Sequence, residues 1–557
     1  MNIKEKIAND INIKFDCVDF EDLIIESVSP DKGDFCLPCF SLAKSLHKNP
    51  MIIAEEIANN IRLSGVIEKV EVLSGYVNFF LKKSTITAQI VENFSVENFK
   101  SNQGQGKVVC VDYGSPNLAK YLHIGHLKTL IIGESLCRMF EVFGYTVKRL
   151  NFIGDYGTPF GKIIAGMQMW GSIEEVEEKG NDALQDYYVK FNKAEEDDPK
   201  LSQLARDIFK RIEEKDPEIY PIYEKIIKIG LDECVKMFDK LGVKFDDYRG
   251  EMYYNQFVPK TIKTLSNAGL LVDSQGAKIV DLSAFDMAPA VIVKSDGTSI
   301  YASRDLSACF DRQKEYKFDK MIYITDVAQS LHFKQWFKIV ELLGCDYANR
   351  LEHVPYGRFS LPDGKISSRR GKQAVLADLM EVALNKANDV ISGRKFEIEK
   401  PEDVAQKVAK AVLNFSVLKV DRAKDCVFDI DKAFLFEGET APYMQYTYTR
   451  LKSILRKYKD EKVEPDFSFV DVDAFELARQ VNDFSKTIQT SLDKRDSSLI
   501  CKKIMDICKT FNKFYTTTKV IDGNPNTTKA KIMLVDMLKQ TLEFGFYLIC
   551  IDPLEEM

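Results

Sequence analysis

The sequence predicts an α/β protein: a central domain with a doubly wound parallel sheet, a smaller α+β domain before it and an all-α domain after it. Two repeats of one pattern predict the sheet. VVCVDYG and TVKRLNFIGD are strand-like and enclose a long helical pattern, and MIYIT and LEHVPYGRF enclose another. Because strand, helix and strand within about 45 residues require a crossover connection, both repeats imply parallel strands. The length of 557 residues allows about three or four domains.

Residues 1–108 are expected to form the α+β domain. Asn49 and Pro50 supply a cap and a first helical turn, after which isoleucines recur on one helix face. On both sides of Ser74-Gly75, apolar residues alternate with polar ones. This alternation about a turn predicts a β-hairpin.

Residues 109–375 are expected to contain the parallel sheet. The first long helical pattern stops at Gly144, a residue type common at helix ends. Residues 157–250 are helical in pattern and hold 21 acidic and 15 basic residues, so they are expected to form an acidic insertion between the two repeats. Two strand-helix-strand halves with an interruption describe a split nucleotide-binding fold.

Almost everything beyond residue 376 is helical in period. We expect a connecting helical segment at 376–434 and a C-terminal helical domain at 435–557. The C-terminal domain holds 19 acidic and 18 basic residues, and its aromatic residues gather with bases in FEGETAPYMQYTYTRLKSILRKY. Such a surface can stack on unpaired nucleic-acid bases, although an amphipathic core helix has the same composition.

Composition excludes several classes of protein. With 45% hydrophobic and 29% charged residues the chain is neither disordered nor fibrous. It has no apolar stretch of the roughly 18–20 residues that span a bilayer and no signal-peptide core, so a cytosolic protein without membrane contact is expected. The only close cysteine pair, Cys36 and Cys39, lacks a partner pair or histidine, so reduced thiols and no structural zinc are expected.

The first chemical signal is the segment from Ser115 to His126, SPNLAKYLHIGH, between a strand and the next helix. A helix N-terminus favours anions through its unpaired N–H groups and its dipole. His123 and His126 can donate hydrogen bonds to phosphate, and Gly125 allows a nucleotide to approach the backbone. Each histidine taken alone is more often a hydrogen-bonded core imidazole than a ligand.

The second signal is LPDGKISSRRGK, residues 361–372, after the last predicted strand. Between Arg358 and Lys372 it has five bases and one acid. A basic loop of this kind can hold a triphosphate and stabilise the charge that develops when the α-phosphate is attacked. A solvated loop without a ligand remains the alternative.

Together the two signals resemble the paired signatures of class I aminoacyl-tRNA synthetases. The phrases SPNLAKYLHIGHLKT, NFIGDYGTPFGKII, SDGTSIYASRDL and AQSLHF are similar to those of the arginyl-tRNA synthetase family, and the likeness extends over essentially the whole chain. The resemblance implies a Rossmann-like catalytic domain at 109–375, an N-terminal domain that touches the tRNA elbow and a C-terminal anticodon-binding domain. It also implies ATP-dependent ligation of L-arginine to tRNA(Arg) through an arginyl-adenylate, with transfer to the ribose 2′-hydroxyl.

Family resemblance also assigns the site residues. The arginine-binding positions fall on Asn117, Glu251, Tyr301, Asp305 and Gln329. Two carboxylates suit this substrate because its planar cation stays charged at cellular pH. The ATP-binding positions, with Mg²⁺ carried by the nucleotide, fall on His123, Gly125, His126, Lys365, Ser367 and Ser368. The aromatic and basic residues of the C-terminal segment, which the resemblance places in an anticodon-binding domain, give Tyr443, Tyr446, Tyr448, Arg450 and Arg456 as the expected tRNA-binding residues.

Several cations are candidates for the catalytic role. His123 and His126 are expected to act with Lys120, Lys365 and Arg369. Arg369 stands where the class signature has its second lysine. Which of Lys120, Lys365 and Arg369 dominates is therefore left open. The partners implied are tRNA(Arg), L-arginine and ATP, and a monomer is expected.

Three other readings remain. A nucleotidyltransferase for a smaller substrate would share the helix start but not the insertion or the helical domain. A synthetase-like binding protein would not need His123, Gly125, His126 and Lys365. A synthetase for another amino acid is disfavoured because Glu251 and Asp305 suit a cation. The net charge of −7 does not exclude a polyanionic partner, since the acidic excess lies mainly in the insertion.

Overall fold

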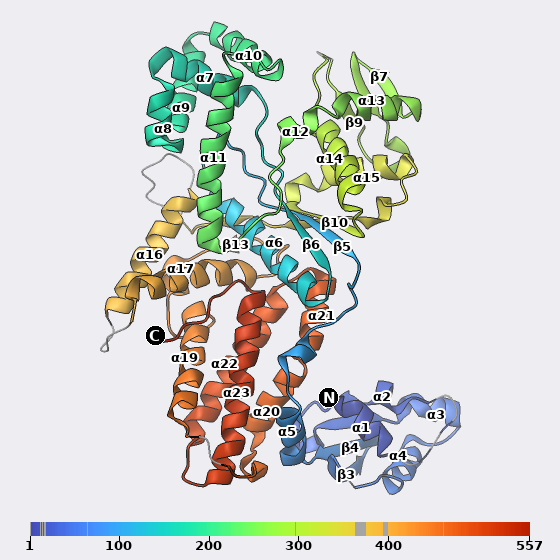
Figure 1. The fold of residues 1–557 in the computed structure, drawn as a ribbon. Helices are drawn as coiled ribbons and strands as arrows, with labels where there is room; N and C mark the ends of the chain where they lie inside the picture. Colours follow the sequence, from blue (N-terminus) through green and yellow to red (C-terminus); the bar gives the residue numbers. More distant parts are fainter. Residues whose placement is uncertain are drawn as a thin grey trace. The chain divides into compact units, whose positions relative to one another are not determined.

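The computed structural model describes the chain except residues 1, 12, 14, 16, 17, 64, 296, 363–374, 394–398, 460, 461 and 557 (Figure 1). The chain forms two compact units. The first unit comprises Met1–Phe99, Thr447–Lys486 and Lys503–Phe544, and the second comprises Lys100–Tyr446, Thr487–Lys502 and Gly545–Met557. The second unit therefore contains both the predicted central sheet and the last residues of the chain.

The central sheet of the second unit is parallel throughout, which confirms the predicted fold class. β5 (Val108–Asp112) pairs with β6 (Thr146–Leu150) and with β10 (Lys320–Asp326), and β10 pairs with β11 (Leu351–Tyr356). The strand order is β11-β10-β5-β6. The order reverses between β5 and β10, and in such sheets ligands bind at the carboxyl ends of the strands beside this switch point.

Helices cover both faces of this sheet. Cys110, Met321 and Tyr323 belong to a buried core with α14 (Tyr301–Tyr316) and α15 (Ser330–Leu342). Because side chains alternate along a strand, Val109 and Val111 point to the other face, where α6 (Ile124–Val142) packs (Figure 1). This helix is buried on most of its surface, so the sheet and its neighbours fix its position.

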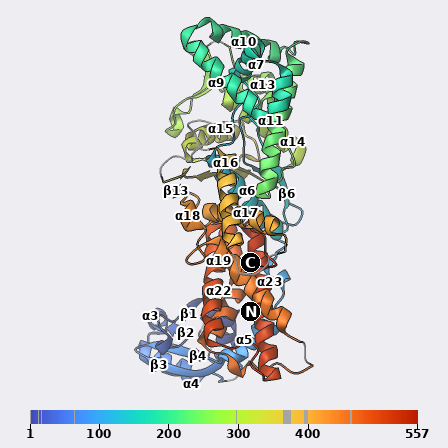
Figure 2. The same cartoon turned by 90° about the vertical axis from the view of Figure 1, so that its left-hand side faces the viewer.

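Residues 157–250, expected to be helical, fold into helices that lie together in both views (Figures 1 and 2). They are α7 (Thr158–Trp170), α8 (Ile173–Lys179), α9 (Asn181–Asp197), α10 (Lys200–Glu213) and α11 (Tyr220–Leu241). The next elements, which include an antiparallel sheet that the sequence analysis did not predict, are α12 (Glu251–Asn255), α13 (Val258–Asn267), β7 (Leu271–Ser274), β8 (Ala277–Val280) and β9 (Ala290–Val293).

The connecting segment lies within the second unit. Its helices α16 (Leu376–Ser392) and α17 (Pro401–Leu418) pack against each other and against α6. β12 (Phe359–Ser360) pairs with β13 (Cys426–Val427), and α18 (Ile430–Ala433) follows. Lys128 of α6 is fully buried and donates to the carbonyls of Gly357 and Lys424, both at 2.8 Å. This contact connects α6 with both chain segments that carry the small β12–β13 pair.

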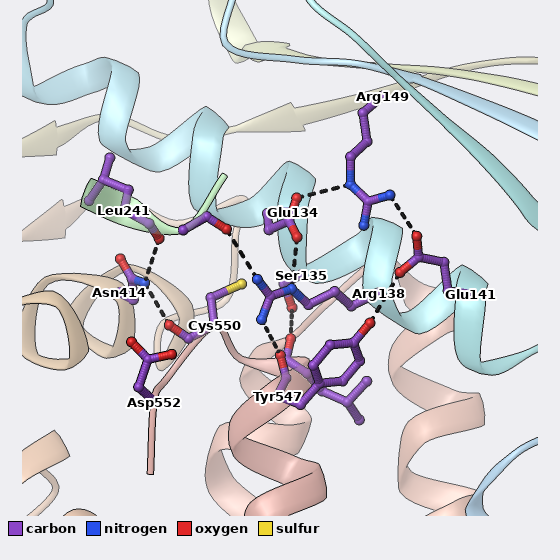
Figure 3. Close-up of polar contacts among 12 residues, drawn as sticks. Glu134, Ser135, Arg138, Glu141, Arg149, Leu241, Asn414, Tyr547, Cys550 and Asp552 are labelled. Carbon is purple, nitrogen blue, oxygen red and sulfur yellow. Dashed lines mark hydrogen bonds and ion pairs between the residues drawn. The ribbon is translucent and has the colours of Figure 1, made fainter. Parts of the chain in front are cut away.

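The end of the chain is held by side chains that bind its main-chain carbonyls (Figure 3). Arg138 of α6 donates to the carbonyl of Tyr547 at 2.8 Å, and Ser135 donates to that of Leu548 at 2.7 Å. Arg138 is itself held by Glu134, one turn before it, in an ion pair of 2.7 Å. These contacts make the last residues part of the same unit as the parallel sheet.

Asn414 of α17 makes the neighbouring contact. Its amide donates to the carbonyl of Cys550 at 2.7 Å and to that of Leu241 at 3.5 Å, and the residue is fully buried (Figure 3). Asn414→Leu should lower the free energy of unfolding by about 1–3 kcal/mol because buried carbonyls lose their donor. Urea titration of this variant beside Asn267→Leu, at an exposed position, measures the effect. Equal losses in the two variants would contradict the prediction.

The first unit has an antiparallel sheet of order β1-β2-β4-β3. The predicted hairpin is confirmed by β3 and β4, and Asn49 caps α4 by accepting from the N–H of Met51 at 2.9 Å. The N-terminal elements are α1 (Ile3–Asn9), α2 (Phe20–Leu23), β1 (Ile25–Glu26), β2 (Phe35–Pro38), α3 (Phe40–Leu46), α4 (Pro50–Asn59), β3 (Ile67–Leu73), β4 (Tyr76–Leu81) and α5 (Lys83–Glu92).

The helices of the C-terminal part are longer than those of the N-terminal part. They are α19 (Ala441–Lys457), α20 (Val472–Asn482), α21 (Phe484–Lys494), α22 (Ser498–Thr517) and α23 (Pro525–Leu548). Within the first unit α20 packs against α5, and Arg479 of α20 forms an ion pair with Glu26 at 2.8 Å. The first unit thus joins N-terminal and C-terminal parts of the sequence. In the described part of the chain, no helix is both long and apolar enough to cross a membrane.

Candidate functional site

The histidine signature, His123 to His126, lies at the N-terminus of α6, after the connection that leaves the carboxyl end of β5. His123 is the N-cap residue, and its Nδ1 accepts from the N–H of Gly125 at 3.0 Å. His126 reaches back, and its Nδ1 accepts from the N–H of His123 at 3.1 Å. The two rings thereby form a capping box, in which two of the unpaired N–H groups of the helix start are satisfied.

Burial and these contacts determine the charge of both imidazoles and the tautomer of His123. Burial lowers the pKa of His126 to about 3, and burial together with Lys120 lowers the pKa of His123. Both rings are therefore neutral at pH 7. Nδ1 of His123 uses its lone pair on the N–H of Gly125, so Nε2 of His123 bears the hydrogen. Nδ1 of His126 lies 3.1 Å from the backbone nitrogen of His123 and 3.3 Å from its carbonyl oxygen, so these contacts suit either tautomer of His126. The signature therefore presents two neutral imidazoles, with an Nε2–H donor on His123, beside the positive end of a helix dipole, which suits a phosphate chain.

Gly125 has a packing reason that the sequence did not reveal. A Cβ at this position would lie 2.7 Å from Cε1 of the His123 ring. Any side chain here would displace the imidazole from its cap. The absence of a side chain at Gly125 thus allows His123 to keep its capping position. It also leaves room for the expected close approach of a nucleotide.

The first described residues after the predicted basic loop lie beside this signature. Val375 forms a β-bridge with His123, and the N–H of Leu376 donates to the carbonyl of Leu122 at 2.8 Å. The predicted loop residues Lys365, Ser367, Ser368 and Arg369 lie outside the described residues. Val375, the first described residue after the predicted basic loop, therefore lies against the histidine signature.

The predicted pocket carboxylates come from two helices. Glu251 is the first residue of α12, and its N–H donates to the carbonyl of Ile153 at 3.1 Å, after the end of β6. Asp305 lies in the second turn of α14, where its carboxylate contacts Nε2 of His332 at 2.5 Å. Tyr301 begins α14 and is 68% exposed, so its ring is open to a ligand.

Glu251, Asp305 and Asp155 form an acidic cluster, and burial raises the pKa of two of its members. It raises the pKa of Glu251 to about 7 and the pKa of Asp155 to about 6. Asp305 and Asp155 raise the pKa of Glu251 further, which places the three carboxylates in one electrostatic cluster. A cation that enters the cluster would favour the ionised forms.

The sequence analysis missed three residues of this cluster: Asp155, Arg304 and His332. Arg304 forms an ion pair with Glu251, between Nε and Oε2, at 2.8 Å. Asp155 accepts from the N–H of Met252 at 2.8 Å and thereby fixes the start of α12. All three lie in quoted phrases, NFIGDYGTPFGKII, SDGTSIYASRDL and AQSLHF, but no local pattern indicates which residues those side chains meet.

The remaining predicted residues surround the same edge of the sheet. Asn117 is exposed and forms a β-bridge with Gly154, which joins the segments after β5 and β6. Gln329 is exposed in a short 3₁₀ helix (Val327–Gln329) after β10, and Lys120 is exposed before the signature. The segments after three neighbouring strands thus meet the signature and the acidic cluster at the switch point.

Comparison with known proteins decides the family. Models of the class I (R) tRNA synthetase catalytic domain, the DALR anticodon-binding domain and the arginyl-tRNA synthetase N-terminal domain match residues 86–430, 444–557 and 1–81. An arginine-tRNA ligase of Clostridium perfringens is 39% identical over 562 residues, covering 100% of this chain and 99% of the relative. The chain belongs to the arginyl-tRNA synthetase family. This confirms the predicted family.

A further relative and two solved structures are also similar to this chain. An arginine-tRNA ligase of Halothermothrix orenii is 37% identical, with 100% of both chains covered. The solved arginyl-tRNA synthetase of Thermus thermophilus superposes with a TM-score of 0.80 at 22% identity over 96% of both chains. That of Plasmodium falciparum gives 0.78 at 22% identity over 96% of this chain and 94% of its own. At this identity the two structures show a shared fold.

The residues predicted to bind tRNA lie on α19. In the second unit Tyr443 and Tyr446 are partly exposed. In the first unit Arg456 is exposed, whereas Arg450 donates to Oδ1 of Asn512 and lies over the ring of Tyr515.

Tyr448 lies in the core, with only 1% of its surface exposed. Its ring is therefore covered by protein in this structure and cannot stack on a tRNA base as expected. The amphipathic-helix alternative describes Tyr448 better. Tyr443, Tyr446 and Arg456 remain the predicted tRNA contacts.

Proposed function

We propose that the chain ligates L-arginine to tRNA(Arg) with ATP, through an arginyl-adenylate. The observation that carries the proposal is the meeting of the two neutral imidazoles of His123 and His126 at the start of α6 with an acidic cluster around Glu251, all at the carboxyl edge of one parallel sheet. The imidazoles suit a triphosphate, and the acidic cluster suits a guanidinium.

In the first step the arginine carboxylate attacks the α-phosphorus of ATP in line, and pyrophosphate leaves. His123 and His126 would donate from Nε2 to phosphate oxygens, where negative charge develops. Lys120, Lys365 and Arg369 are the proposed additional cations. Mg²⁺ is proposed to enter with the ATP phosphates.

In the second step the 2′-hydroxyl of the terminal tRNA ribose attacks the carbonyl carbon of the adenylate, and AMP leaves. Neither step needs a protein nucleophile, so the proposed catalysis consists of positioning and charge stabilisation. Asn117 and Gln329, exposed at the switch point, are proposed to hold the α-amino and carboxylate groups of the amino acid.

The function is tested by ATP-pyrophosphate exchange with each of the twenty amino acids, with and without total tRNA. Arginine should support exchange, and the family resemblance adds that tRNA should be required. Exchange with another amino acid and none with arginine would overturn the proposal.

Asp305→Asn should lower kcat/KM for arginine by about 10- to 150-fold, the equivalent of losing a charge-assisted hydrogen bond of about 1.5–3 kcal/mol. The same substitution removes the partner of His332, so His332→Asn is the matched control. That variant keeps the carboxylate and should retain most of the activity. Equal losses in both variants would assign Asp305 to the support of His332 and remove it from the pocket.

A further inference from the structure

Arg304 places a guanidinium of the protein inside the pocket proposed for a guanidinium substrate. Its side chain is only 5% exposed, and its Nε lies 2.8 Å from Oε2 of Glu251. The guanidinium carbon lies 4.6 Å from the ring centroid of Tyr156 and 5.4 Å from that of Tyr301. Nη1 also donates to Oγ of Ser299 at 3.2 Å.

These contacts come from separate parts of the chain and hold Arg304 in place. Tyr156 follows β6, Ser299 precedes α14 and Glu251 begins α12. The Glu251 contact engages one carboxylate oxygen, and Oε1 makes no hydrogen bond with the described residues. A carboxylate held at one oxygen still offers the other to a second cation.

We propose that Arg304 is a positioning residue that fixes Glu251 and shares its carboxylate with the substrate guanidinium. This inference rests on the proposed function, because it assumes that arginine binds beside Glu251. Arg304 would bind Oε2 permanently, and the substrate would bind at Oε1. Tyr301 would lie beside both cations, since it is exposed on its outer side and contacts Arg304.

Charge gives Arg304 a second effect on Glu251. Burial raises the pKa of Glu251 to about 7, and Arg304 is the neighbour that lowers it. Without this cation more of Glu251 would be protonated at pH 7, and a neutral carboxyl binds a guanidinium weakly. The titratable or charged groups that act on Glu251 are Arg304 and Asp305 on α14, Asp155 and Tyr156 after β6, and Tyr223 on α11.

The opposite role is conceivable on the same contacts: Arg304 could occupy the substrate position and be displaced by arginine. The two roles predict opposite signs. A positioning residue, when removed, raises KM for arginine, whereas an internal competitor, when removed, lowers it.

The test is arginine-dependent ATP-pyrophosphate exchange by the full chain with tRNA, between pH 6 and 9. Arg304→Gln should raise KM for arginine about 10- to 100-fold at pH 7, with KM for ATP within about 2-fold of wild type. Raising the pH should recover part of this loss. Lys314→Gln, at an exposed position on the same helix, is the control and should behave as wild type.

Two further variants separate this role from a merely structural one. Arg304→Lys keeps the charge but not the planar fork, so KM should rise while the pH profile stays near that of wild type. Arg304→Gln combined with Glu251→Gln should be no worse than Glu251→Gln alone, because Arg304 acts through Glu251.

A lowered KM, an unchanged KM in Arg304→Lys or additive losses in the double variant would overturn the proposal. If Arg304→Gln does not fold, Arg304→Lys decides. Failure of the wild-type chain to exchange with arginine would instead overturn the proposed function.

Discussion

Glu251→Gln is expected to lower kcat/KM for arginine by about 30- to 5,000-fold, or about 2–5 kcal/mol. The side chain of Glu251 is 13% exposed and its carboxylate already faces one guanidinium. Removing the charge leaves Arg304 buried without its anion and removes the partner proposed for the substrate. Both losses act on the arginine-binding step, so pyrophosphate exchange at varied arginine concentration is the measurement.

The matched control is Glu178→Gln, which removes an exposed carboxylate from α8. It should leave the kinetics unchanged. Thermal unfolding of both variants shows whether the loss of activity reflects loss of the fold. A Glu251→Gln protein that is folded and has wild-type KM for arginine would exclude Glu251 from the pocket.

The same carboxylate should give the reaction a pH dependence. Burial raises the pKa of Glu251 to about 7, and only the ionised form pairs with a guanidinium. kcat/KM for arginine should therefore fall as the pH drops below about 7 and reach a plateau above it, since this parameter reports the free enzyme. Glu251→Gln should abolish this limb of the profile. Persistence of the limb would assign it to another group, and Asp155, whose pKa burial raises to about 6, can be tested by Asp155→Asn.

Features that depend on neighbouring residues could be predicted from the sequence. The β3–β4 hairpin follows from alternation about Ser74-Gly75, both of which adopt positive φ. The parallel order of β5 and β6 follows from the helix between them. His123 was placed at a helix start because a strand, a turn and a helical pattern come in sequence. In each case the chain carries the signal within a few tens of residues.

Features that depend on distant residues could not be predicted. The pairing of Glu251 with Arg304 and of Asp305 with His332 joins different helices, and no spacing in the sequence encodes it. The tautomer of His123 needed the cap geometry. Tyr448 shows a further limit: an aromatic stripe on a helix does not reveal which ring faces the core.

Arg312→Met is expected to lower the free energy of unfolding by about 3–5 kcal/mol. Nη1 of Arg312 lies 2.6 Å from Oδ2 of Asp112, with 2% and 6% of the two side chains exposed. Burial raises the pKa of Asp112, and Arg312 opposes that rise. Asp112 ends β5, and the connection to the histidine signature follows it. Because Asp112 is buried, without Arg312 its carboxylate must either remain as a buried charge or take up a proton.

A double variant separates the loss of the pair from the loss of packing. Arg312→Met with Asp112→Asn leaves no uncompensated charge, so it should be more stable than Arg312→Met alone. Urea titrations of the wild type, both single variants and the double variant complete a mutant cycle. If the double variant lost the sum of the two single losses, the ion pair would contribute nothing, and the cost would lie in the contacts of the Arg312 guanidinium with Phe152 and Tyr254. If the double variant is more stable than Arg312→Met alone, Arg312 is needed because it neutralises the buried carboxylate of Asp112.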